Sequence, residues 1–256
     1  MIFMRILPGV LKELVKHVPT ILFEAVEWSS IMSEIPLITR RMLQHEGYAE
    51  LADHQKEILK DLPLCVRHEN VQGPQLKPGD GRIILSLYFR QIFSPHGVFL
   101  DLRSQYFNHE TDVLLWHPGA LWTRFSPEFR EGLAAVYDGF YEENDVLYRD
   151  GLAKLGLLNP DWPEADQEKI MQIFRTHFGA ARSDSIVFKL EHLRDGMVSM
   201  SQFLLEKKAK ITTDFLYLGI YLVTLYGTLE ETGEALPVKE IYLENRSHTG
   251  LTSVKS

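Results

Sequence analysis

Residues 112–133, DVLLWHPGALWTRFSPEFREGL, place a histidine between a short apolar run and the start of a helix. The run VLLW predicts a buried strand. Ser126 and Pro127 predict a helix N-terminus, because serine is a favoured N-cap and proline suits the first helical position. Binding residues are often placed in the turns that end such elements. His117 is therefore a candidate metal ligand, and the rest of the sequence has to supply a site around it.

A second candidate site lies in HEGYAELADH, where Glu46, Glu50 and His54 follow one another at steps of four. That spacing puts all three on one face of a helix. Carboxylates and histidines of a helical bundle can hold two iron ions when facing helices supply matching ligands. His177 is a candidate from a later helix, but the downstream candidates form no Glu-x-x-His pair. A solvated helix face is favoured, and a helical-bundle metalloenzyme is one alternative.

The composition indicates a globular protein that does not bind nucleic acid. A chain of 256 residues with 45% hydrophobic side chains can bury a full core. Its net charge of −8 argues against nucleic-acid binding, because neutralising phosphates needs a basic surface. Cys65 is the single cysteine, which excludes an intramolecular disulfide and a cysteine-rich zinc site and suits a reducing cytosol. The sequence also lacks P-loop, dinucleotide-binding, G-x-S-x-G and H-E-x-x-H motifs.

Two apolar segments bear on contact with a membrane. Residues 2–28 carry apolar side chains at steps of three and four, with a positive bias that suits either a docked helix or an in-plane anchor on anionic lipid. Charges interrupt this segment, so it does not resemble a secretory signal peptide. Residues 215–227 are too short to span a bilayer and predict a buried core helix. We therefore expect a cytoplasmic protein, soluble or peripherally bound to a membrane.

Hydrophobic periodicity predicts a mainly α fold with a few short β-strands. A strand leading into a loop is expected over 64–73, and two more strands in GVFLDL and DVLLW, joined by the polar link RSQYFNHET. The predicted helices cover 33–60, 82–93, 126–141, 143–157, 163–178, 185–206 and 212–232. These predictions divide the chain into three regions. They are an amphipathic helical segment over 1–60, a helical domain over 61–240 and a polar tail over 241–256.

The order of motifs from residue 64 to about 236 resembles the C-terminal lobe of the UbiB/AarF family of atypical protein-kinase-like proteins. CVRHENVQGPQL stands where that family has its hinge, and LYFRQIFSPHGVF resembles the family's helix ending in R-Q-I-F. FSPEFREGL and LAKLGLLNPDW follow in the family's order. The late apolar segment FLYLGIYLVTLYGTLEETG resembles its penultimate helix. The resemblance covers about two-thirds of the chain and implies a truncated, kinase-like C-lobe.

The resemblance also implies roles for individual residues. Glu69 and Gly73 fall in the hinge-like stretch and would contact a cofactor. Asp101 corresponds to the catalytic aspartate and Asn108 to the metal-binding asparagine, at a wider spacing than the family has. His117 stands where the family's metal segment has an aspartate, and imidazole is a poor magnesium ligand. The family's nucleotide-binding motifs are missing upstream of the hinge-like stretch, so we expect a degenerate site.

Two functions from different classes follow from these roles. A non-catalytic, pseudokinase-like binding or scaffold protein is favoured. The family's link with isoprenoid and quinone lipids at membranes implies an isoprenoid lipid or a protein as the partner. The alternative is an atypical ATP-dependent kinase or ATPase with a modified metal site. ATP and Mg²⁺ are expected as cofactors under that alternative alone, and the sequence allows a homo-oligomer in either case.

Overall fold

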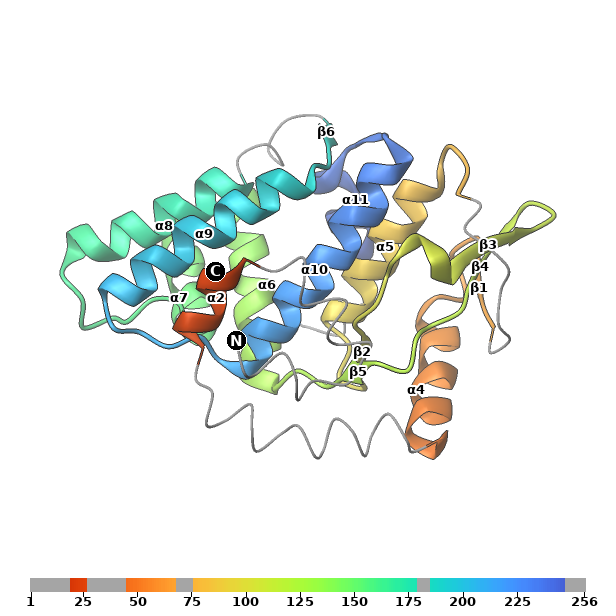
Figure 1. The fold of residues 1–256 in the computed structure, drawn as a ribbon, viewed down its shortest axis with the longest axis horizontal. Helices are drawn as coiled ribbons and strands as arrows, with labels where there is room; N and C mark the ends of the chain where they lie inside the picture. The colour runs from red at the N-terminus through yellow and green to blue at the C-terminus, as the bar shows by residue number, and fades with distance from the viewer. Residues whose placement is uncertain (1–18, 27–44, 68–75, 179–184, 247–256) are drawn as a thin grey trace.

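Figure 1 shows a computed structural model of the chain, in which helices form most of the fold and a small sheet lies at one end. The structure describes residues 19–26, 45–67, 76–178 and 185–246. The mainly α architecture with a few short strands confirms the predicted fold class. Within the described ranges, no helix has the length and hydropathy needed to cross a bilayer.

Five consecutive helices build the larger part of the fold. Side chains cap three of them, because Ser126, Asn144 and Thr212 each accept a hydrogen bond from a backbone N–H three residues further on, at 3.1–3.3 Å. All five lie in predicted segments, although one begins late because residues 186–187 form a strand. The five are α6 (Pro127–Tyr141), α7 (Asp145–Lys154), α8 (Glu164–Phe178), α9 (Leu190–Glu206) and α10 (Thr213–Thr232).

α10 is the central helix of the core. Its side chains are apolar around most of the circumference, and it packs against α9 and α5 (Asp80–Ile92). Thr224 and Thr228 interrupt this apolar surface but are buried, and their hydroxyls donate to the carbonyl oxygens of Leu100 and Leu102 at 3.2 and 2.7 Å. The apolar segment within α10 is thus the buried core helix that its length and hydropathy predict.

A three-stranded sheet carries the turn with the candidate histidine. Its order is β1 (Leu64–Val66), β4 (Val113–Trp116) and β3 (Phe107–Glu110), with β1 parallel and β3 antiparallel to β4. β2 (Val98–Phe99) and β5 (Trp122–Thr123) form a separate antiparallel pair. β1, β2 and β4 confirm predicted strands. β3 corrects the polar link predicted there, because pairing with β4 holds this strand although only its first side chain is buried.

Two helices from the N-terminal part of the chain are described. α2 (Thr20–Ala25) packs on α9 and lies in the apolar stretch over 2–28, of which the structure describes residues 19–26. α4 (His45–Ile58) belongs to the helix predicted over 33–60 and precedes β1. The short helix η2 (Ser104–Tyr106) lies before β3. A last strand pair joins β6 (Ile186–Val187) to β7 (Ala235–Leu236).

The helix α11 (Val238–Arg246) corrects the polar tail that was predicted to begin at residue 241. Ile241 and Tyr242 are buried, and Tyr242 meets the ring of Phe89 on α5 with centroids 5.3 Å apart. The segment is polar in composition, which led to the prediction of a tail. Val238, Ile241 and Tyr242 nevertheless fall on one helix face, and that face packs on α5, whereas Leu243 is exposed.

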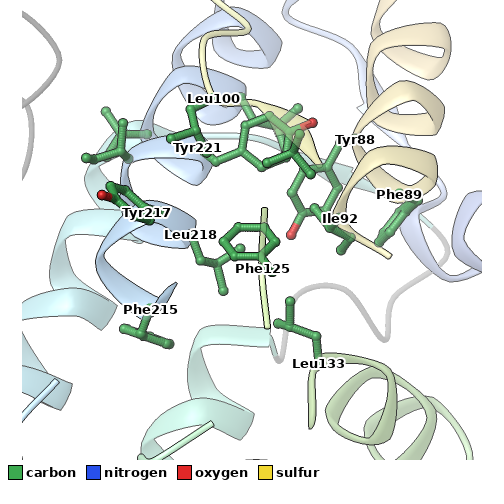
Figure 2. Close-up of a cluster of buried hydrophobic side chains, with 14 of the residues drawn as sticks. Tyr88, Phe89, Ile92, Leu100, Phe125, Leu133, Phe215, Tyr217, Leu218 and Tyr221 are labelled. Atoms are coloured by element: carbon green, nitrogen blue, oxygen red, sulfur yellow. The ribbon is translucent and has the colours of Figure 1, made fainter. Parts of the chain in front are cut away.

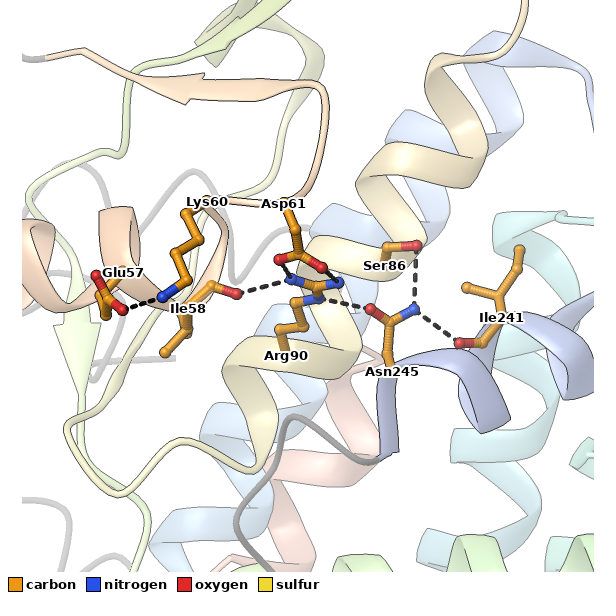
Figure 3. Close-up of polar contacts among 8 residues, drawn as sticks. All are labelled: Glu57, Ile58, Lys60, Asp61, Ser86, Arg90, Ile241 and Asn245. Atoms are coloured by element: carbon orange, nitrogen blue, oxygen red, sulfur yellow. Dashed lines mark hydrogen bonds and ion pairs between the residues drawn. The ribbon is translucent and has the colours of Figure 1, made fainter.

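The side chain of Arg90 joins three parts of the fold (Figure 3). It extends from α5 and only 5% of it is exposed. Its guanidinium forms an ion pair with Asp61 and donates to the carbonyl oxygen of Ile58, at the end of α4, at 2.9 Å. Arg90 Nε donates to Asn245 on α11 at 2.6 Å, and Asn245 in turn donates to Ser86. Because a buried charge has to be paired, these contacts hold α4 and α11 against α5.

Replacing Arg90 with methionine should lower the free energy of unfolding by about 3 kcal/mol, because acceptors on both neighbouring helices lose their donor. Arg82→Met is the matched control. Arg82 also joins α5 to α11, but its ion pairs with Glu240 and Glu244 are exposed, and such pairs contribute under about 1 kcal/mol. Urea denaturation of both variants measures the difference. Equal losses of stability would contradict the role assigned to Arg90.

Candidate functional site

The three central candidate residues lie on one hairpin and on the loop before it. Asp101 follows β2, Asn108 lies in β3 and His117 follows β4. The backbone N–H of His117 donates to the carbonyl oxygen of Tyr106 at 2.9 Å. This bond continues the pairing of β3 with β4 and links the turn after β4 to the end of the loop that follows β2. We treat the loop and the hairpin together as one candidate site.

Asp101 is fully buried, and its carboxylate is occupied. Arg103 Nε and Nη2 donate to its two oxygens at 2.9 and 2.6 Å, and the backbone N–H of Arg103 donates to Oδ1 at 3.2 Å. The hydrogen bonds to Asp101 raise the pKa of the Arg103 guanidinium above its ordinary value, so Arg103 stays charged. With both oxygens engaged by Arg103, this carboxylate would have to disturb a partly buried ion pair in order to take a substrate proton or bind a metal.

Asn108 and His117 lie on the same face of the hairpin. Asn108 pairs with Leu115 in the β3–β4 register, so strand alternation puts Phe107 and Trp116 on the opposite face. Asn108 Oδ1 is buried and has no hydrogen-bond partner among the described residues. An amide and an imidazole are a weak ligand set for Mg²⁺, which prefers carboxylate oxygens. In the described part of the chain, no three His, Cys, Asp or Glu side chains form a group suited to a metal.

α4 covers the turn that carries His117. Tyr48 donates a hydrogen bond to the carbonyl oxygen of Pro118 at 2.7 Å, and Gln55 Nε2 donates to that of Gly97 at 3.2 Å. α4 thus bonds to the turn at His117 and to the residue just before β2. Sequence patterns do not indicate this cover, because its contacts join residues 70 and 42 positions apart in the chain.

Two candidate residues on one face of α4, Glu50 and His54, have different surroundings. Glu50 is exposed, whereas His54 stacks on His96, with ring centroids 3.6 Å apart and an angle of 14° between the planes. His54 therefore joins α4 to the turn after α5 and takes no part in a metal cluster among the described residues. The candidate residues that lie outside the described part, in whole or in their side chains, are Glu46, Glu69, Gly73 and His177.

An apolar cavity lies in the helical half of the molecule, where the sequence indicated no site. It has a volume of about 50 Å³ and is lined by α5, α6, α8, α9 and α10. Figure 2 shows four of its wall residues, Tyr88, Leu133, Phe215 and Leu218, approaching one another from three of these helices. The hydroxyls of Tyr88 and Tyr137 bond to each other at 2.9 Å, and burial raises the pKa of both groups. The wall therefore carries no charge at neutral pH.

A polar cleft of about 580 Å³ lies next to this cavity, between α8 and α9. Ile173 and Gly196 line both the cleft and the cavity. In α9 the sequence signal for this cleft is Gly196. Glycine in the middle of a helix lowers helix stability, so its presence indicates a packing or functional role. The polar side chains of the cleft are Lys169, Gln172, Thr176, His192, Asp195 and Ser199.

No protein-family model matches the chain, and no curated protein matches it. The case for a function therefore depends on the geometry of the described residues and on the resemblance of the sequence motifs. The two candidate sites are the covered hairpin site and the cavity with its cleft.

The His54–His96 stack should make the docking of α4 sensitive to acid. Burial, with smaller contributions from His54 and Arg124, lowers the pKa of His96 below its ordinary value of 6.5. The unfolded chain then takes up the proton first, so this contribution to stability is present above about pH 6.5 and is lost as the pH falls towards the lower pKa of the folded state. Glu50 opposes the shift, and Arg130 adds to it.

His96→Asn should therefore flatten the fall in Tm between neutral and mildly acidic pH. His192→Asn is the matched control, because His192 is exposed on α9 and its loss removes one histidine without touching the stack. Thermal denaturation across the pH range compares the three proteins. A wild-type slope in His96→Asn would remove His96 as the source of the acid sensitivity.

Proposed function

We propose that this chain is a non-catalytic, pseudokinase-like binding protein built on a kinase-like C-lobe. The occupied carboxylate of Asp101 carries the proposal. In kinase-type catalysis an aspartate of the catalytic loop accepts the proton of the attacking hydroxyl, and its carboxylate has to reach the substrate. Asp101 is instead buried and paired through both oxygens with Arg103.

The order of elements around Asp101 supports the kinase-like part of the proposal. α5 and the RQIF motif are followed by β2, the loop with Asp101, the β3–β4 hairpin and the turn at His117. In protein kinases a catalytic loop and a metal-binding turn converge on the phosphates of ATP. The corresponding segments touch here through the His117–Tyr106 hydrogen bond, but the turn carries an imidazole in place of a carboxylate.

The position of α4 supports a binding role without catalysis. Tyr48 and Gln55 bond to backbone carbonyls of the turn and of the residue before β2, so a helix lies where a nucleotide would need access. The hydrogen bond from Tyr48 on α4 also gives a backbone carbonyl of the turn a partner. The site is thus stable as a covered structure.

The partner is inferred from the resemblance and from the cavity. A family linked with isoprenoid and quinone lipids implies a lipid or protein partner at a membrane surface. The apolar cavity among the helices supports a lipid, because ligand sites are concave and mostly apolar. On this proposal the chain holds its partner and transfers no phosphate.

Thermal denaturation with and without ATP, Mg²⁺ and Mn²⁺ tests the proposal. A ligand at 100 times its Kd adds about 2.7 kcal/mol to the free energy of unfolding and raises Tm by several degrees. We expect no shift at millimolar ATP. A metal-dependent shift would overturn the proposal in favour of an ATP-dependent kinase or ATPase with a modified site at Asp101, Asn108 and His117.

Asp101→Ala should act on stability, with a loss of about 1–3 kcal/mol in the free energy of unfolding, because Arg103 and its backbone N–H lose their acceptor. Asp101→Asn keeps one acceptor oxygen and should lose less. Asp112→Ala is the matched control, since Asp112 is exposed in the nearby hairpin turn and should change stability by under about 0.5 kcal/mol. Chemical denaturation ranks the variants, and an Asp101→Ala protein as stable as wild type would contradict the structural role.

A further inference from the structure

The apolar cavity and the polar cleft are neighbours that share two lining residues. Ile173 of α8 and Gly196 of α9 line both, so the same two residues face the two spaces. We propose that the cavity and the cleft form one site for a single-chain amphiphile, with the end of its hydrocarbon chain in the cavity and an uncharged polar head in the cleft. The proposal rests on the proposed function as a binding protein and adds the class of ligand.

The size of the cavity determines which end of the ligand enters it. At about 50 Å³, it is smaller than the roughly 150 Å³ cavity that holds a benzene ring. A ring is therefore too large, whereas the last carbons of an alkyl or prenyl chain fit. The wall exposes almost no polar atoms, so the empty cavity is dry, and a chain that enters it displaces no bound water.

The cleft suits a polar head without net charge. Its volume of about 580 Å³ lies within the range of small-molecule sites. Lys169 is already paired with Glu206 at 3.5 Å, so it offers no free cation to an anionic head. The other polar groups of the cleft are the carboxylate of Asp195, the imidazole of His192, one amide and two hydroxyls. These groups donate to and accept from hydroxyl and ester oxygens. A carboxylate head would have to compete with Glu206 for Lys169 and would also face the like charge of Asp195.

Isothermal titration calorimetry of the full chain, below micelle-forming concentrations, tests the assignment with three probes. Monodecanoylglycerol combines a hydrocarbon chain with an uncharged head and should bind. Decanoate carries the same chain length on an anionic head and should bind about tenfold more weakly. Glycerol has the polar groups without a chain and should show no binding.

Gly219→Ala reduces the cavity and leaves the fold intact. Gly219 lies in α10 at the cavity wall, and a Cβ atom there would make ordinary contacts with Met197 at 3.5 Å and Leu22 at 3.9 Å. Alanine also favours the helix, so the variant should unfold at the same or a higher temperature. Its affinity for monodecanoylglycerol should nevertheless fall by about fivefold to tenfold.

Gly227→Ala is the matched control for this variant. Gly227 lies in the same helix, a Cβ atom there would meet open space, and the position does not line the cavity. The control should gain helix stability and keep the wild-type affinity. Unchanged affinity in Gly219→Ala, equal or tighter binding of decanoate, or no binding of monodecanoylglycerol would each overturn the amphiphile site.

Failure of this site is separable from failure of the proposed function. Nucleotide binding is measured by the ATP titration, whereas the amphiphile is measured by calorimetry. A Tm shift with ATP and metal overturns the non-catalytic role. Absence of both an ATP shift and amphiphile binding rejects the amphiphile site and leaves a protein as the partner of a non-catalytic chain.

Discussion

The buried guanidinium of Arg90 is the constraint on which the described fold depends. A buried charge is tolerated only when acceptors surround it, and Arg90 takes its acceptors from the end of α4, from the residues just after it and from α11. Both helices therefore have to close on α5. With α4 held in this way, Tyr48 and Gln55 reach the turn at His117 and the start of β2. An interaction remote from the candidate site thus decides that the site is covered.

Most of the fold is predictable because its signals are local. Three of the helices from residue 126 onward begin at capping side chains, and these helices carry apolar runs, so both features are visible within a few residues of sequence. α11 escaped prediction because its buried face ends in Asn245, whose burial makes sense only with Arg90, 155 residues away. β3 escaped for a related reason. Three of its four side chains are polar, and pairing with β4 is what makes it a strand.

The position of the hairpin site could be predicted from the sequence, but the pairing of its carboxylate only in part. Asp101, Asn108 and His117 are close in sequence, so one hairpin suffices to bring them together. The pairing of Asp101 with Arg103 is local as well, and the Asp-x-Arg spacing is a signal that could have indicated an occupied carboxylate. The cavity had no comparable signal beyond the mid-helix glycines Gly196 and Gly219. Five helices supply its wall, and its size depends on how they pack, which no short stretch of sequence records.

α10 connects the two candidate sites. On one side, Thr224 and Thr228 hold the carbonyl oxygens that flank Asp101, and on another side Leu218 and its neighbours line the cavity. A tightly packed helix transmits displacement as a unit, so the loop fixed by the Asp101–Arg103 pair also fixes one wall of the cavity. A cavity formed before its ligand arrives loses less conformational entropy on binding. The loop that carries Asp101 is rigid because its carboxylate is paired with Arg103, and a rigid loop suits a binding protein. The Asp101–Arg103 pair and the preformed cavity therefore both depend on the same packed core.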